Sequence, residues 1–354
     1  MKKIFTLLFF LVSISLTAQE ETETKEKKFE FSGSIDVYYR SNITGPNEYT
    51  ITDPETEITS DPIFLAPGSS FANLPGFALG MANVIASYEG EKVGFVADLV
   101  FGPRGTDAVF ASPMYSATGD IVNQLYAYWK VSEKVKLTLG NFNTFLGYEV
   151  ISPTANFNYS TSYLFSYGPF SHTGFKADFA ITDDLSFMAA VMNDTDLTEF
   201  NPTGDYAVGA QLGYKSQFLN FIYDPSFTEI DFTGGFNITE PFFLGINAAY
   251  LTLESNGGGF AGGALYPQYT FSDLFTLGLR AEYFIEDGDF GAIGTGVENS
   301  SVFATTLTGS FTIDDLTIKP EIRLDSASDD AFLDTDLVPT KSLGSFLIAA
   351  IYKF

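Results

Sequence analysis

The sequence has no cysteine and a single histidine, His172, among its 354 residues. Without cysteine, the chain has no disulfides, thiolate catalysis or cysteine-based metal site. Basic residues are also scarce, with 18 Lys and Arg against 44 Asp and Glu, so nucleic acid is not an expected partner. Beyond the first 20 residues, no uncharged apolar run approaches the roughly 18 residues that a membrane helix needs. These absences exclude helical membrane proteins and most metal and thiol enzymes.

The N-terminal residues have the pattern of a secretory signal peptide. Lys2 and Lys3 precede an apolar stretch over 4–16, and a small residue, Ala18, stands at the expected cleavage point. A buried N-terminal helix is the alternative, but the charged segment 19–28 follows directly and would not pack in a core. We therefore expect a signal peptide over 1–18, a charged periplasmic segment over 19–28 and a folded domain over 29–354.

From Phe29 onward, apolar and polar residues alternate with a period of two. The run 275–283 shows the pattern, with Phe275, Leu277 and Leu279 alternating with Thr276 and Arg280. An alternation of this kind predicts strands with one apolar face and one polar face. The chain is therefore expected to be all-β.

The connections between these strands differ systematically in length. Seven tight turns alternate with eight looser connections, most of them long, which predicts sixteen strands with both termini on the tight-turn side. The tight turns fall at 89–92, 132–134, 182–184, 215–217, 239–241, 272–273 and 314–315. A transmembrane antiparallel up-and-down β-barrel has short periplasmic turns, long extracellular loops and no free edge. A soluble sandwich or propeller also alternates, but has no reason to sort its connections by length.

The last expected strand ends in an aromatic residue. Alternating apolar residues run from 342 to Phe354, a pattern similar to the signal that the barrel-assembly machinery reads. Aromatic residues such as Tyr88, Trp129 and Phe179 also stand beside the tight turns, where an interfacial girdle is expected. The lipid bilayer of the outer membrane and the assembly machinery, acting through Phe354, are therefore expected partners.

Four segments of the chain resemble a known family. Residues 31–42, 79–105, 123–151 and 158–183 are similar to the OmpL-like β-barrel porin family. The resemblance is good over 31–195, and beyond that only the strand pattern and the terminal Phe continue it. It implies an outer-membrane pore of a Gram-negative bacterium. It supplies no ligand residues to carry over, and fold alone does not fix function.

A barrel of sixteen strands is wide enough to enclose a water-filled lumen. By strand parity, the residues expected to line it are Asp36, Arg40, Asp98, Tyr126, Tyr128, Lys130, His172, Lys176, Asp178, Arg280, Glu282, Glu321 and Arg323. Lys176 with Asp178, and Arg280 with Glu282, stand two residues apart on one face. Such charges either create a transverse field that selects ions or neutralise one another and support the wall.

The loop 143–162 contains more apolar residues than a solvated loop needs. Phe145, Tyr148, Phe157 and Tyr159 are the candidates for a constriction if this loop folds into the lumen. The alternative is that the loop caps the barrel and packs on other loops.

The other long loops are strongly acidic. Together, 41–76, 193–205, 286–299 and 326–341 contain seventeen Asp or Glu and one Lys. Paired acids there could bind Ca²⁺, but none has the spacing of a complete calcium loop, so solvated charge is the favoured interpretation. A negative mouth predicts a preference for cations.

These observations favour a passive diffusion porin for small hydrophilic solutes or ions. The alternative is a barrel with an occluded lumen that acts as a ligand- or surface-binding structural protein through its long loops. We expect no enzymatic activity, because Ser171 and His172 point to opposite faces of a strand and cannot form a nucleophile–base pair by themselves. We also expect no cofactor and no metal, and the sequence leaves monomer and trimer open.

Overall fold

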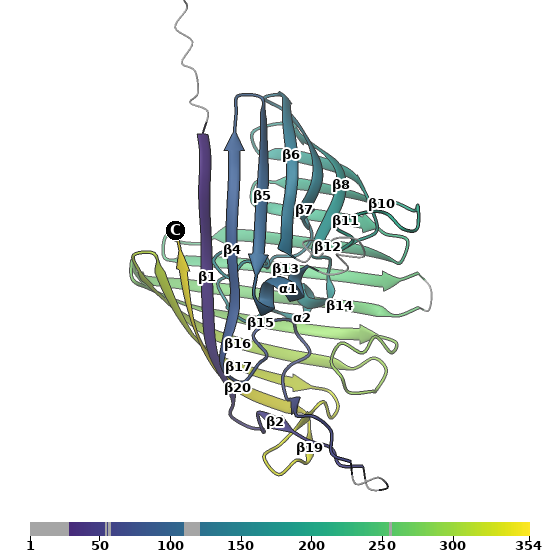
Figure 1. The fold of residues 1–354 in the computed structure, drawn as a ribbon, viewed down its shortest axis with the longest axis vertical. Helices are drawn as coiled ribbons and strands as arrows, with labels where there is room; N and C mark the ends of the chain where they lie inside the picture. Colours follow the sequence, from purple (N-terminus) through teal and green to yellow (C-terminus); the bar gives the residue numbers. More distant parts are fainter. Residues whose placement is uncertain (1–27, 54, 56–57, 110–120, 255–256) are drawn as a thin grey trace, which may run out of the picture.

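The computed structural model describes residues 28–53, 55, 58–109, 121–254 and 257–354. The expected signal peptide, 1–18, and the charged segment up to residue 27 lie outside these described residues. The described chain forms a closed barrel of sixteen strands, each antiparallel to its neighbours (Figure 1). The predicted fold class and strand count are confirmed.

Strands adjacent in sequence are adjacent in the barrel wall, and the first strand pairs with the last. The barrel strands are β1 (Lys28–Asn42), β4 (Gly76–Glu89), β5 (Val93–Phe101), β6 (Val122–Ser132), β7 (Val135–Asn143), β8 (Ser171–Ala180), β9 (Leu185–Met192), β10 (Ala207–Tyr214), β11 (Gln217–Tyr223), β12 (Phe227–Asn237), β13 (Phe242–Leu253), β14 (Gly259–Ser272), β15 (Phe275–Asp287), β16 (Ser301–Ile313), β17 (Leu316–Ala327) and β20 (Ser342–Lys353). Closure comes from the pairing of β1 with β20, which runs from Ser34 opposite Lys353 to Asn42 opposite Ser345. No edge of the sheet is left unpaired, as a lipid environment requires.

The period-two pattern places apolar residues outside and polar residues inside. On β1, Phe31 and Ile35 are 61% and 55% exposed, whereas Asp36 and Arg40 are 4% and 2% exposed. On β4, Phe77 is 92% exposed. An apolar exterior is what a barrel presents to lipid, and the buried polar face is turned toward the lumen.

The connections are sorted by rim, as expected. Short turns such as 133–134, 215–216 and 314–315 join strands at one rim, and Lys215 and Asp314 adopt left-handed φ values of 56° and 51° there. The other rim carries the longer loops, two of which contain small hairpins: β2 (Glu48–Tyr49) with β3 (Ile63–Phe64), and β18 (Phe332–Leu333) with β19 (Pro339–Thr340). No described helix is both long and apolar enough to cross a membrane.

The connection between β7 and β8 enters the barrel instead of standing above it. Residues 144–170, here termed the inserted segment, join β7 to β8 and contain the short helix α2 (Tyr163–Tyr167). Figure 1 shows α2 and a second short helix, α1 (Pro103–Ala108), in the middle of the barrel. Leu164 of α2 belongs to a buried cluster with Phe260 and Phe284 of the wall. The hydrophobic core of this protein therefore lies within the barrel.

Candidate functional site

Two aromatic residues in the first part of the inserted segment pack against wall glycines. A Cβ atom built on Gly209 of β10 would stand 2.5 Å from the Phe145 ring. A Cβ on Gly245 of β13 would overlap the phenol of Tyr148. The Tyr148 ring also stacks on Tyr266 of β14, with centroids 4.3 Å apart and planes inclined by 25°. The absence of a side chain at these wall positions gives the rings room to reach the strands.

The other two candidate aromatics reach a different part of the wall. Phe157 lies against Gly278 of β15, where a Cβ would overlap the ring. Tyr159 is fully buried, and its hydroxyl donates a 2.5 Å hydrogen bond to Asp36 of β1. Gly80 of β4 makes room for this pair, because a Cβ there would overlap the Asp36 carboxylate. The four aromatics thus contact strands on several sides of the barrel, among them β1, β10, β13 and β15.

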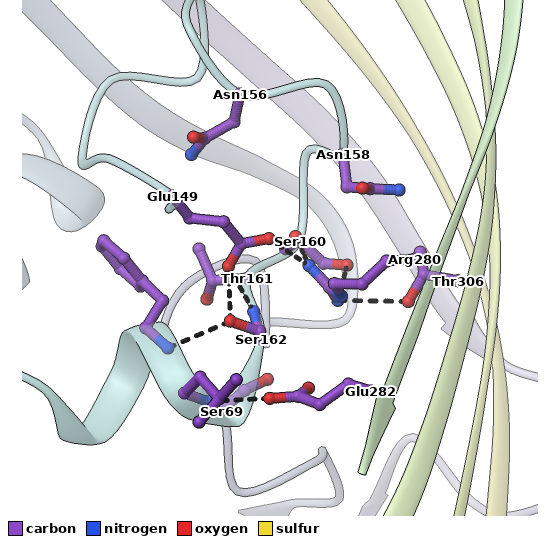
Figure 2. Close-up of polar contacts among 12 residues, drawn as sticks. Ser69, Glu149, Asn156, Asn158, Ser160, Thr161, Ser162, Arg280, Glu282 and Thr306 are labelled. Carbon is purple, nitrogen blue, oxygen red and sulfur yellow. Dashed lines mark hydrogen bonds and ion pairs between the residues drawn. The ribbon is translucent and has the colours of Figure 1, made fainter. Parts of the chain in front are cut away.

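An ion pair ties the middle of the segment to β15. The Arg280 guanidinium donates to Glu149 at 2.7 Å, to the Ser160 carbonyl at 2.6 Å and to Thr306 Oγ1 at 3.1 Å (Figure 2). Arg280 is 0% exposed, and Glu149 also accepts hydrogen bonds from the backbone and the hydroxyl of Ser162. Charge-assisted hydrogen bonds of this length are strong and directional, so they fix the segment in place.

Two further wall carboxylates accept hydrogen bonds from backbone amides of the segment. Glu282 on β15 accepts from Tyr163 N at 3.0 Å and from Leu164 N at 2.8 Å, at the start of α2. Glu321 on β17 accepts from Tyr159 N at 2.9 Å and from Ser160 N at 3.2 Å. These contacts satisfy amides that would otherwise be buried without partners.

Two arginines join the β5–β6 and β3–β4 connections to the same cluster. Arg104 of α1 donates to the carbonyls of Ile151 at 2.9 Å and Tyr159 at 3.1 Å. Arg323 of β17 forms two 2.8 Å hydrogen bonds with Asp325 and another of 2.8 Å with Ser69 Oγ in the β3–β4 connection. Three connections of the long-loop rim therefore meet inside the barrel.

The predicted lumen residues fall into groups instead of forming one ring. Asp36, Arg280, Glu282, Glu321 and Arg323 gather at the inserted segment. Arg40, also buried, donates to Asn42 Oδ1 at 2.8 Å. These side chains face the barrel interior and are buried there.

The other predicted residues lie elsewhere on the wall. Asp98 accepts hydrogen bonds from the amides of Asn83, Asn123 and Gln124. Lys130 pairs with Glu89 at 2.6 Å near the tight-turn rim. Tyr126 and Tyr128 are partly buried on β6, and Tyr126 packs against the buried cluster that includes Leu146 of the inserted segment. The contacts of Asp98 and Lys130 are with other parts of the wall.

The two same-strand couples of opposite charge differ in their contacts. Lys176 and Asp178 approach to 3.9 Å. Arg280 pairs with Glu149 instead of Glu282, because the inserted segment offers each of the two residues a closer partner. His172 is fully buried between the rings of Phe142 and Phe145 and lies 3.0 Å from Thr144 Oγ1.

Sequence reasoning missed Glu149, Arg104 and Asp325. A signal for Glu149 was present, because it is the only charged residue in the loop 143–162. Arg104 and Asp325 carried no comparable signal. No group of three or more His, Asp or Glu residues that could hold a metal ion occurs in the described part of the chain.

The inserted segment divides the space inside the barrel. On the tight-turn side, a cavity of about 540 Å³ lies between the segment and strands that include β14, β16 and β17. On the loop side, a cleft of about 10 Å³, room for one water molecule, lies beside Arg40, Ser160 and Arg323. Lys319 lines the cavity, Arg323 lines the cleft, and Glu321 stands between them on β17. Ser160 and Glu321 are hydrogen-bonded between the cavity and the cleft, and this region is here termed the constriction.

A closed β-barrel with an apolar exterior and a lumen narrowed by an inserted loop is a porin-type outer-membrane barrel. The chain belongs to the family described as "Putative beta-barrel porin-2, OmpL-like", whose family model matches residues 28–354. Family and fold together place the protein in the outer membrane.

Solved structures show the same fold at low sequence identity. The loop L8 deletion mutant of OmpT, an outer membrane protein of Vibrio cholerae, is 14% identical with a TM-score of 0.56, covering 93% of this chain and 99% of that one. An anion-selective porin from Comamonas acidovorans is 11% identical with a TM-score of 0.57, covering 93% of this chain and 100% of that one. At these identities the likeness concerns the fold alone. Among curated proteins, no match to this chain is found.

Proposed function

We propose that the chain is an outer-membrane porin through which small hydrophilic solutes or ions diffuse passively, with a preference for cations. The observation that carries the proposal is a barrel interior in which a polar cavity meets a charged constriction. The wall residues Lys319, Glu321 and Arg323 follow one another along β17 from the cavity to the cleft. A path lined in this way replaces part of the hydration shell of a permeating solute.

The charges at the constriction are balanced. Five basic residues, Arg40, Arg104, Arg280, Lys319 and Arg323, are buried there with five acidic residues, Asp36, Glu149, Glu282, Glu321 and Asp325. The constriction therefore contributes no net charge, and the acidic loops decide whether cations or anions are preferred. Their potential concentrates cations within about a Debye length, roughly 8 Å at physiological ionic strength.

Planar bilayer recordings test this function. We expect discrete conductance steps from the purified barrel. Reversal potentials across a KCl gradient should show K⁺ preferred over Cl⁻, with the preference weakening as the salt concentration rises. A preference for chloride at low salt would mean that Arg40 or Arg323 controls the constriction, and would contradict the cation preference while keeping the pore.

An occluded barrel that binds ligands or surfaces is the second candidate. The buried apolar cluster around Leu164 and the small volume of the cleft favour it. A barrel that inserts correctly but gives no conductance would support this candidate over the porin. We infer no enzymatic activity under either proposal.

Export and assembly complete the proposed function. We infer that residues 1–18 direct secretion and that the C-terminal strand is read by the barrel-assembly machinery. Phe354 supports this, since its backbone exchanges hydrogen bonds of 3.0 and 3.1 Å with Gly33 while its side chain stays 56% exposed. Phe354→Ala should lower the amount of assembled barrel, measured as the heat-modifiable band in outer-membrane fractions. An unchanged amount would contradict the role of Phe354.

A further inference from the structure

The cavity on the tight-turn side of the inserted segment has the size of a small-molecule site. Its volume of about 540 Å³ falls in the range of roughly 300–1,000 Å³ typical of ligand pockets. Asn156 and Asn158 of the inserted segment form one boundary, and the inner faces of β14, β16 and β17 form another. A solute that enters from the tight-turn rim therefore meets this cavity before the constriction.

Two kinds of surface line the cavity. One consists of aromatic rings, namely Phe157, Phe243 and the stacked pair of Tyr148 and Tyr266. The other consists of uncharged hydrogen-bonding side chains, namely Gln268 of β14, Ser310 and Thr312 of β16 and Thr317 of β17. Aromatic faces suit the C–H surface of a sugar ring, whereas amides and hydroxyls suit its hydroxyl groups.

The charged groups that line the cavity are already engaged or stand at its edge. Glu149 is paired with Arg280 at 2.7 Å. The Lys319 ammonium donates to the carbonyls of Pro153 at 3.1 Å and of Asn156. Lys353, at the tight-turn rim, adds a second cation to the lining, whereas Glu149, the one carboxylate among the described residues that line the cavity, is occupied by Arg280. A cationic solute in the cavity would therefore lose hydration without gaining an opposite charge, which is costly.

The uncharged polar side chains of this second surface have no hydrogen-bond partner among the described residues. Gln268, Ser310 and Thr317 are partly buried and form no side-chain hydrogen bond there, and the same holds for the exposed Thr312. Since they stand on the inner face beside the cavity, their donors and acceptors are available to a ligand.

We infer that this cavity is a binding site for a small neutral polyhydroxylated solute of the sugar class. The inference rests on the proposed porin function, of which it names the solute class. Aromatic faces hold the ring, Gln268, Ser310 and Thr317 exchange hydrogen bonds with its hydroxyls, and the constriction then admits the solute to the other side.

Isothermal titration calorimetry on the purified full chain tests the site with sucrose as the probe. The detergent should carry no sugar headgroup, because maltoside or glucoside detergents would compete. We expect saturable binding of sucrose in the millimolar range, and binding of N-methylglucamine, a polyhydroxylated cation, at least tenfold weaker. No saturable binding of sucrose, or equal binding of N-methylglucamine, would overturn the inference.

Variants separate the cavity from general effects on the barrel. Thr317→Val and Gln268→Leu should each weaken sucrose binding about fivefold, because each removes one hydrogen-bonding group at nearly constant volume. Thr138→Val is the matched control, since Thr138 is a buried threonine of β7 that does not line this cavity. Equal weakening by the control would contradict the site. Ion conductance without sucrose binding would refute this inference alone, and sucrose binding without conductance would refute the porin function alone.

Discussion

The ring of Phe157 lies so close to Gly278 that a Cβ atom at this wall position would overlap it. Gly245 and Gly209 stand in the same relation to Tyr148 and Phe145. The aromatic residues of the inserted segment and the glycines of the wall therefore form matched contacts, and the depth of the segment in the barrel depends on both.

A side chain at Gly278 should move the inserted segment. Gly278→Val places two methyl groups where the Phe157 ring lies, and overpacking of this kind costs about 1–3 kcal/mol. We expect the segment to shift away from β15 and the single-channel conductance in planar bilayers to rise.

Gly263→Val on the neighbouring strand β14 provides the control for this change. The nearest atom to a Cβ at Gly263 is the Asn247 carbonyl oxygen at 3.6 Å, an ordinary contact. This variant should conduct like the native barrel. Equal conductance in both variants would mean that the Phe157 contact does not set the width of the pore.

The buried pair of Arg280 and Glu149 should show strong coupling. Arg280→Met leaves the Glu149 carboxylate buried without its cation, which typically costs about 3–5 kcal/mol. Glu149→Gln leaves Arg280 buried without its counter-ion and should cost a similar amount. The double variant removes both charges and should be more stable than the sum of the two single losses predicts.

Urea unfolding in lipid vesicles measures this coupling. Trp129, the single tryptophan, is 51% exposed on the outer face of β6 and reports the transfer of the wall from lipid to water. Additive losses in the two single variants would show that the pair contributes no specific stabilisation.

The barrel was predictable because its signals are local. The alternation in 275–283 shows directly which side chains of β15 face lipid, and the turn residues at 314–315 show where one strand ends. The same alternation and the same turn residues, followed along the chain, predict sixteen strands. Each strand and each turn is recognised from residues that are at most a few positions apart.

The arrangement of the inserted segment was only partly predictable. The aromatic content of 143–162 was compatible with an in-folded loop or with a cap on other loops. The partners of this loop are remote in sequence, and Arg280 is 131 positions from Glu149. Strand parity predicts that the side chains of Arg280 and Glu282 point inward. It does not predict how deep in the barrel a loop will contact them. The partners of these two side chains could therefore not be predicted.

Charge on the outer face of the wall should impair assembly. Leu279 faces outward near the middle of β15, opposite Leu307 of β16, which is 44% exposed. Leu279→Arg should destabilise the barrel by about 2–4 kcal/mol if it lies near the bilayer midplane. Thr276→Arg places the same charge on the inner face of the same strand and should be tolerated better. Equal loss of the heat-modifiable band in both variants would contradict the assignment of the two faces.

A carboxylate outside the strands should make the stability depend on pH. Asp196, in the connection between β9 and β10, accepts hydrogen bonds from Phe170 N at 2.9 Å and Ser171 N at 2.8 Å. Burial raises the pKa of Asp196 to about 6, although these two backbone donors oppose the shift, and nearby Asp224 adds to it. A raised pKa means that the folded state binds the proton more tightly than the unfolded state. Stability therefore falls as the pH rises from about 4 through 6.

Asp196→Asn should remove this dependence and raise stability at pH 8. The amide oxygen can accept the same two hydrogen bonds without a buried charge. Asn also tolerates the left-handed φ of 64° at this position. The gain in unfolding free energy at pH 8 should stay below about 3 kcal/mol, since one pKa unit corresponds to about 1.4 kcal/mol and the side chain retains some exposure. At pH 4 the two proteins should unfold alike. The measurement is urea unfolding at both pH values, and a variant that is less stable than the native chain at pH 8 would show that the charged carboxylate is the form the fold prefers.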